Sequence, residues 1–132
     1  MGGDKTMIAI GIGCRRGASK EAIIAIVAEA LARAALVPDS AQLFTYDGKR
    51  DEAGLVAAAS ELAMPLAFLT LEALRAVADH IATRSEAAEK ALGISSVAEA
   101  SALAGCGSSG HLLLPRITGD GVTCAIAKGN DR

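Results

Sequence analysis

The 132-residue chain is almost without aromatic side chains: it has no tryptophan, one tyrosine and two phenylalanines. Its formal net charge is only −2, and it carries no run of basic residues. Proteins that bind nucleic acids stack bases on aromatic rings and neutralise phosphates with clustered cations, so this composition argues against that class. No apolar run approaches the ~20 residues needed to cross a bilayer. We therefore expect neither a nucleic-acid partner nor a membrane span.

Cysteine is also scarce, with three residues in no CxxC or zinc-type spacing: Cys14, Cys106 and Cys124. An odd, sparse count fits reduced thiols in the cytoplasm, and the N-terminus lacks the pattern of a secretory signal. His80 and His111 are far apart in the sequence, and we expect them at the surface or at strand ends. The sequence thus predicts a cytoplasmic protein that has no cofactor and no metal site.

Short apolar segments alternate with helical patterns along most of the chain. Strands are predicted at residues 7–12, 41–46, 66–69, 111–114 and 122–127, and helices at 19–36, 52–63, 71–77, 83–92 and 96–104. Residues 105–110 are predicted as a loop and residues 116–121 as a hairpin turn. This order predicts one α/β domain over residues 1–132, with a layered, mostly parallel sheet, helices on both faces and a C-terminal antiparallel hairpin. We expect residues 1–6 to be disordered or added, and residues 128–132 to form a tail.

The loop after the first strand is the most informative segment, because residues 11–19 read Gly-Ile-Gly-Cys-Arg-Arg-Gly-Ala-Ser. Glycines let a backbone approach a ligand closely, a capped helix N-terminus attracts anions, and arginines bind carboxylates or phosphates in a bidentate manner. The predicted anion site comprises Gly13, Cys14, Arg15, Arg16, Gly17 and Ser19, the last as helix cap. A tight turn with solvated arginines is the alternative interpretation. The glycine spacing departs from the dinucleotide pattern, and no P-loop is present, so a nucleotide-binding module is a less favoured reading.

Cys14 lies beside the predicted helix start and two cations, an environment that should lower the pKa of its thiol. It could therefore be a nucleophile. No histidine motif lies near it in the sequence, so a Cys/His pair cannot be argued. A small packing residue is the simpler interpretation.

Two further segments are expected at the same edge of the sheet, because ligands of such sheets bind beyond the C-terminal ends of the strands. Residues 47–52, Asp-Gly-Lys-Arg-Asp-Glu, follow the second strand, and residues 95–99 begin a helix. The ligand-binding candidates here are Asp47, Lys49, Ser95, Ser96 and Glu99. A solvated turn is the alternative for the first segment, and a capping box formed by Ser96 and Glu99 is the alternative for the second.

Taken together, these blocks resemble the CobE family. Residues 11–19, residues 47–55, residues 93–100 (Gly-Ile-Ser-Ser-Val-Ala-Glu-Ala) and residues 122–127 occur in the order seen in that family. The family is similar to the C-terminal domain of CbiG, the cobalt-precorrin-5A hydrolase of cobalamin biosynthesis. The resemblance covers nearly the whole chain.

The resemblance implies a ligand, a corrin-ring intermediate with many peripheral carboxylates, and other cobalamin-pathway enzymes as possible partners. It also implies a role as carrier or accessory protein. The alternative is a small hydrolase that opens the ring-attached δ-lactone and releases acetaldehyde. Its weak catalytic candidates are Asp47, Asp51 and Glu52 as general base, and Cys14. A further region precedes this domain in CbiG, whereas only residues 1–5 precede the first predicted strand, so binding is the favoured expectation.

Overall fold

The computed structural model describes residues 5–36, 41–81, 89–90, 96–107 and 110–131. Its strands are β1 (Lys5–Cys14), β2 (Ala41–Tyr46), β3 (Leu66–Leu69), β4 (His111–Thr118) and β5 (Val122–Asp131). Its helices are α1 (Lys20–Arg33), α2 (Ala53–Leu62), α3 (Leu71–Ala76) and α5 (Val97–Cys106), with short 3₁₀ turns η1 (Asp47–Lys49) and η2 (Ala78–His80).

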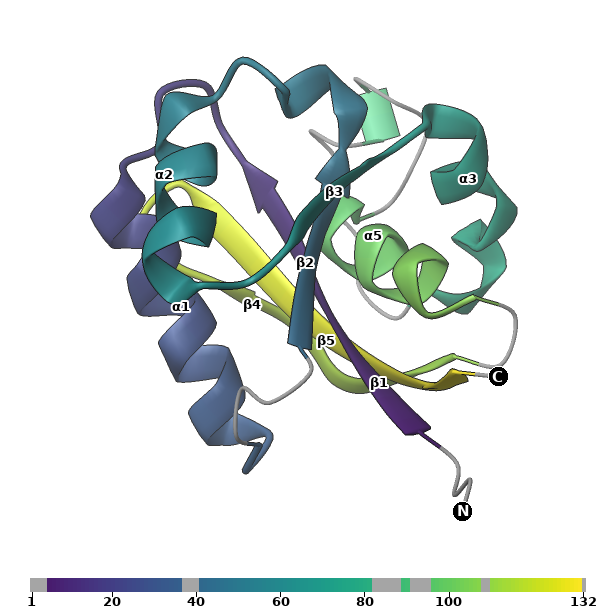
Figure 1. The fold of residues 1–132 in the computed structure, drawn as a ribbon. Coiled ribbons are helices and arrows are strands. Elements are labelled where there is room, and N and C mark those ends of the chain that lie inside the picture. The colour runs from purple at the N-terminus through teal and green to yellow at the C-terminus, as the bar shows by residue number, and fades with distance from the viewer. Residues whose placement is uncertain (1–4, 37–40, 82–88, 91–95, 108–109, 132) are drawn as a thin grey trace.

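The five strands form one sheet in the order β3-β2-β1-β5-β4. Pairs β1–β2 and β2–β3 are parallel, whereas β1–β5 and β4–β5 are antiparallel. Helices α1 and α2 cover one face, and α3 and α5 cover the other (Figure 1). The predicted α/β fold is thus confirmed, with a C-terminal antiparallel hairpin added to the parallel strands.

The central strand β1 carries large side chains on one face and mostly small ones on the other, which we call its small face. Ile8, Ile10 and Ile12 are buried in the main core with the apolar residues of α1 and α2. Successive side chains of a strand point to opposite faces, so Ala9, Gly11 and Gly13 lie on the other face, with Met7 near the start of the strand. Helix α5 lies directly on this small face: a Cβ added to Gly11 would be 1.9 Å from the carbonyl oxygen of Ala98.

Three predicted helix starts are confirmed by side-chain caps. The hydroxyl of Ser19 accepts from the N–H of Ala22 at 3.0 Å, and Thr70 caps α3 in the same way. The hydroxyl of Ser96 accepts from the N–H of Glu99 at 3.2 Å at the start of α5. Each cap satisfies a backbone donor that has no partner within its helix.

The C-terminal strands are longer than predicted. Strand β5 pairs with β1 from Cys14↔Val122 to Lys5↔Asp131, so residues 128–131 continue the strand where a tail is predicted, and β1 starts at Lys5. Strand β4 reaches Thr118, which shortens the predicted 116–121 turn to residues 119–121. The strands are longer because their antiparallel partners supply backbone hydrogen bonds beyond the apolar segments. The pattern of apolar residues does not indicate these additional pairs.

Helix boundaries also differ from the prediction. Helix α5 continues to Cys106, two residues into the predicted 105–110 loop. Helix α1 ends at Arg33, ahead of the predicted residue 36, and the chain leaves it with Ala35 at φ +56°. Ser95 and most of the helix predicted for residues 83–92 lie outside the described residues.

Candidate functional site

Three segments meet at the end of the sheet where β1 and β2 finish, and we call them the rim: residues 13–19, 47–52 and 96–98 (Figure 1). The N–H of Gly17 donates to Oε1 of Glu52 at 2.9 Å, which joins the first two segments. A Cβ on Gly13 would lie 3.6 Å from the amide nitrogen of Ala98, which brings in the third. The predicted convergence of the loop, the charged turn and the helix start is therefore observed for the residues that the structure describes.

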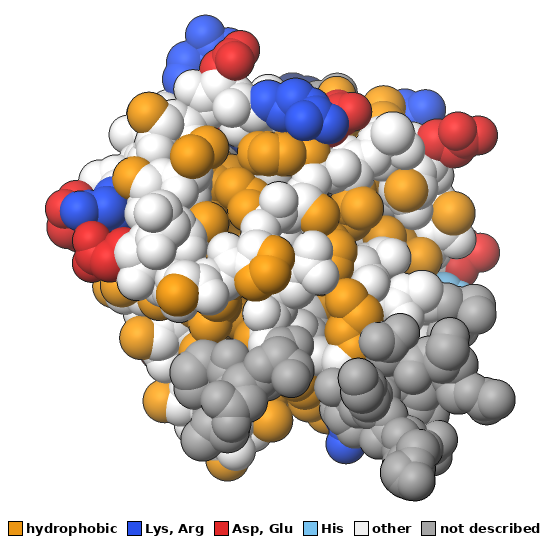
Figure 2. Space-filling view, viewed as in Figure 1, with side chains coloured by type: hydrophobic (Ala, Val, Ile, Leu, Met, Phe, Trp, Pro, Cys, Tyr) orange, Lys and Arg blue, Asp and Glu red, His pale blue; other side chains and the backbone are white. Residues whose placement is uncertain are grey.

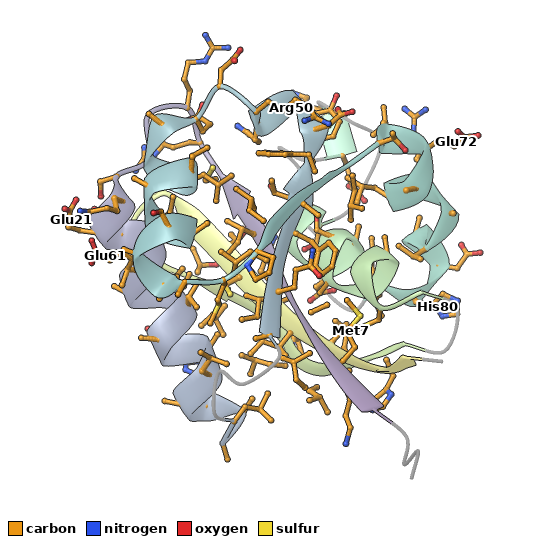
Figure 3. The ribbon with its side chains drawn as sticks, viewed as in Figure 1. Met7, Glu21, Arg50, Glu61, Glu72 and His80 are labelled. Carbon is orange, nitrogen blue, oxygen red and sulfur yellow. The ribbon has the colours of Figure 1, made fainter. Side chains whose placement is uncertain are left out.

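Charged side chains of both signs gather along this edge, above a face that is largely apolar (Figure 2). Arg50 is one of them: its guanidinium carbon lies 4.8 Å from the ring centroid of Phe68 (Figure 3). This cation–π contact holds Arg50 against the end of β3.

The two neighbouring arginines of the first loop have different environments. The backbone N–H of Arg15 donates to the carbonyl oxygen of Gly121, and its guanidinium lies 3.7 Å from Asp120. Both side chains of this pair are exposed, so the pair contributes little to stability. Arg15 thus leans over the β4–β5 turn, whereas Arg16 is exposed and makes no ion pair with any residue of the described chain.

Glu52 has a structural task in the rim. Its Oε1 accepts from the N–H of Gly17, a residue with φ +81°, and the residue itself stands at the start of α2. A backbone donor predicted for a ligand anion is thus already used by an internal carboxylate. Of the other two acidic candidates, Asp47 begins η1 and is half-buried, and Asp51 is exposed.

Burial raises the pKa of the Cys14 thiol, so the predicted lowering is wrong. Loss of solvation of the half-buried thiol is the largest cause, the positive charge of Lys49 acts in the opposite direction, and Glu52 adds a smaller upward effect. The thiol is therefore less ionised than a free cysteine. The half-buried Lys49 thus exerts an electrostatic effect on Cys14 that the sequence order does not reveal.

Ser96 and Glu99 are both buried, with exposed fractions of 1% and 0%. The Ser96 hydroxyl caps α5, as the capping interpretation predicts. The Glu99 carboxylate makes a further contact that a capping box does not predict. Its Oε2 accepts a hydrogen bond from the backbone N–H of Arg116 in β4 at 2.8 Å. Neither side chain reaches the surface where a ligand would bind.

Thr123 is a rim neighbour that the sequence analysis did not identify. Its hydroxyl donates to the carbonyl oxygen of Gly13 at 3.3 Å. The two residues are direct partners in the antiparallel pairing of β1 with β5. Its position in the sequence, second residue of the last strand, carries no signal for this contact. Only the antiparallel pairing of β1 with β5 brings it there.

A cleft of about 470 Å³ lies away from the rim, between the C-terminal parts of α3 and α5. Among the described residues its walls are small or apolar, with one histidine: Ala73, Ala76, Val77, His80, Leu103, Ala104, Gly107 and Gly110. Figure 3 shows His80 at the far end of α3 from Arg50. None of the predicted site residues lines this cleft.

No group of three or more His, Cys, Asp or Glu side chains among the described residues could hold a metal ion. Within the same residues no helix has the length and apolar character of a membrane span.

Comparison with known proteins identifies relatives along nearly the whole chain. Residues 8–127 match the family model described as cobalamin synthesis G C-terminus. The curated protein CobE of Sinorhizobium sp is 34% identical over 121 residues, which make up 91% of this chain and 79% of CobE. The sequence-based resemblance is thereby confirmed.

Solved structures agree. The crystal structure of CobE, a protein from the cobalamin (vitamin B12) biosynthetic pathway, matches with a TM-score of 0.87 at 34% identity, covering 96% of this chain and 94% of that one. Cobalamin biosynthesis protein chiG from Agrobacterium tumefaciens matches with a TM-score of 0.72 at 36% identity, covering 95% and 100%. A cobalamin biosynthesis protein G homolog from Sulfolobus solfataricus shares the fold, with a TM-score of 0.66 at 22% identity, and this chain covers 36% of it. The chain belongs to the CobE/CbiG C-terminal-domain family of cobalamin biosynthesis.

Proposed function

We propose that this chain binds a corrin-ring intermediate of cobalamin biosynthesis at the rim, through the carboxylates at the ring periphery, as a carrier or accessory protein. The observation that carries the proposal is the convergence of the charged turn and the first turn of α5 on the loop after β1, through the Gly17–Glu52 hydrogen bond and the approach of Gly13 to Ala98. Family membership supplies the chemical class of the ligand, and the rim supplies groups suited to it.

The first turn of α5 brings backbone N–H groups and the positive end of the helix dipole to the rim. The N–H of Glu99 is capped by Ser96, and the N–H of Ala100 donates to the carbonyl oxygen of Ser96. The two preceding N–H groups, of Val97 and Ala98, belong to the part of a helix that has no acceptor within the helix. A Cβ on Gly13 would also lie 2.6 Å from Oγ1 of Thr123, so this hydroxyl borders the same N-terminal end of α5, where the helix dipole favours negative charge.

Two cations of the rim complement these backbone donors. The positive charge of Lys49 acts to lower the pKa of the Cys14 thiol, against the larger effect of burial. Arg16 extends from the loop after β1 and makes no ion pair with any described residue. Hydrogen bonds from charged donors to carboxylates are roughly twice as strong as neutral ones. Arg15 and Glu52, in contrast, have internal partners, so we assign them to the architecture of the rim.

Lactone hydrolysis is the alternative function, and it would need an active base or nucleophile at the rim. An oxygen of Glu52 already accepts a hydrogen bond from the loop, and burial keeps the Cys14 thiol protonated. Neither observation favours catalysis, because efficient bases and nucleophiles have pKa values tuned towards the working pH. Binding is therefore the function that the geometry supports best.

Spectral titration tests the proposal directly, since corrins and their precursors absorb visible light. We expect saturable binding of a free-acid corrinoid with about one ligand per chain, given one such rim. Arg33→Ala serves as matched control, because Arg33 pairs with Glu29 at the far end of α1. Absence of any spectral change with a panel of tetrapyrrole acids would refute the proposal. Enzyme-dependent acetaldehyde release from the lactone intermediate, abolished by Glu52→Gln, would establish the alternative.

A further inference from the structure

We infer that Glu99 is a positioning residue: its buried carboxylate ties the first turn of α5 to an irregularity in β4 and so holds that turn in the rim. The inference rests on the proposed binding function, because it explains how one wall of that site is kept in place. Glu99 itself does not contact the ligand, since its side chain is fully buried.

The partner of Glu99 is a backbone group at an irregular point of the sheet. Strand β4 pairs Leu114 with Ile126 and Ile117 with Cys124, so three steps along β4 match two along β5. An extra residue of this kind leaves a backbone group outside the regular ladder. The N–H of Arg116 lies within this interval, and Oε2 of Glu99 accepts its hydrogen bond at 2.8 Å.

A fully buried carboxylate is costly unless hydrogen bonds compensate for its lost hydration. An exposed glutamate would stabilise a helix start equally well, as Glu72 does in the first turn of α3. The burial of Glu99 is therefore more than helix capping requires. Its additional task is the bond across to β4.

This bond fixes α5 from a second side. On the first side, the helix backbone lies against β1, where a Cβ on Gly11 would come 2.5 Å from the amide nitrogen of Ala102. That contact sets how close α5 lies to the sheet, whereas the Glu99 bond sets the rotation of its first turn. The amide of Ala98, one residue before Glu99, is the part of α5 that faces Gly13 at the rim.

Charge and geometry can be separated by substitution. Glu99→Gln removes the negative charge but keeps a carbonyl oxygen at the same reach, whereas Glu99→Asp keeps the charge on a side chain one methylene shorter. A negative charge in the first turn of α5 opposes binding of an anion at that turn. A positioning role therefore predicts that Gln preserves or strengthens ligand binding and that Asp and Ala weaken it.

The test uses the full chain and cobyrinic acid, a corrin whose peripheral side chains are free carboxylic acids. We expect Glu99→Gln to bind at least as tightly as the unchanged protein, and Glu99→Asp and Glu99→Ala to bind about tenfold more weakly or worse, the effect of losing one buried hydrogen bond. Glu72→Ala is the matched control and should leave affinity unchanged. Equal affinity of Glu99→Asp and the unchanged protein, or loss of binding in a folded Glu99→Gln, would overturn the inference.

Amide hydrogen exchange provides a readout that does not depend on the ligand. We expect Val97 and Ala98 to exchange faster in Glu99→Asp than in Glu99→Gln, while amides of α1 exchange equally in both. Uniform rates at Val97 and Ala98 across these variants would refute the positioning role even if Glu99→Ala fails to fold. Lack of cobyrinic acid binding by the unchanged protein, with this exchange pattern present, would refute only the proposed function.

Discussion

Gly11→Ala should destabilise the fold strongly, because the added methyl group has no space. Its Cβ would lie 1.9 Å from the carbonyl oxygen of Ala98 and 2.5 Å from the amide nitrogen of Ala102. Both atoms belong to the backbone of α5, so a rotamer change cannot relieve the contact. The helix would have to move away from β1 by at least about 1 Å, which breaks the dense packing of a protein interior.

The expected cost follows from two opposing effects. Overpacking of a core costs about 1–3 kcal/mol, and contact with backbone atoms places this variant at the upper end. Replacing glycine by alanine restricts the unfolded chain, which returns about 0.4–1 kcal/mol. We therefore expect the free energy of unfolding to fall by about 2–2.6 kcal/mol.

Urea unfolding followed by far-UV circular dichroism measures this change, since the chain has no tryptophan for fluorescence. Gly119→Ala is the control: the nearest atoms to its Cβ would all belong to the side chain of Ile26, and the closest, Cδ1 at 3.2 Å, is the end of a flexible side chain that can shift. We expect the control to stay within about 1 kcal/mol of the unchanged protein. If Gly11→Ala is as stable as Gly119→Ala, the close contact between β1 and α5 is refuted.

Three other predictions concern the rim and the cysteines. Arg16→Ala and Lys49→Ala should each weaken corrinoid binding by about 1.5–3 kcal/mol where the contact is shielded from water, with little change in urea midpoint; unchanged titration curves would contradict this. Cys14→Ser should keep binding within about tenfold, because the protonated thiol has a packing role, and a covalent adduct seen by mass spectrometry would contradict it. Burial raises the pKa of Cys106 to about 11 and that of Cys124 to about 12, from 9.0. Their contribution to stability is therefore constant below pH 9. Above pH 9 the free energy of unfolding falls by about 1.4 kcal/mol per pH unit and per thiol until the folded pKa is reached. Urea titrations at about pH 8 to 10 should show that the free energy of unfolding falls less steeply with pH in Cys124→Ala than in the unchanged protein.

Local patterns were sufficient to predict the strands and most of the helices that the structure describes, although several boundaries differ. Residues 41–46 and 66–69 form strands with the predicted boundaries, because each is a short apolar segment between strong turn and capping signals. The convergence of loop, charged turn and α5 at one edge also follows from general rules for parallel strands. These predictions needed only neighbouring residues and the alternation of strand and helix.

The parts that could not be predicted depend on contacts between distant segments. The environment of Cys14 is set mainly by burial, which the charges beside it in the sequence do not indicate. Glu99 reads locally as one half of a capping box, yet its carboxylate reaches Arg116, whose N–H is available only because β4 is irregular there. Arg15 turns to Asp120 because the β4–β5 turn lies beside its loop, a consequence of the β1–β5 pairing.

That pairing also determines when the sheet can be completed during synthesis. Strand β1 sits in the middle of the sheet, yet its β5 partner is the last strand of the chain, paired with it over ten residues. While the ribosome is still making the C-terminal segment, β1 can bind only β2, and the apolar residues that β5 later covers stay open to solvent. The contacts that close the sheet are therefore among the most distant in the sequence, which slows folding and delays it until residue 131 has left the ribosome. A permuted chain that joins the paired ends at Lys5 and Asp131 and opens elsewhere would make the β5–β1 contact local, and we expect it to fold faster than the natural order.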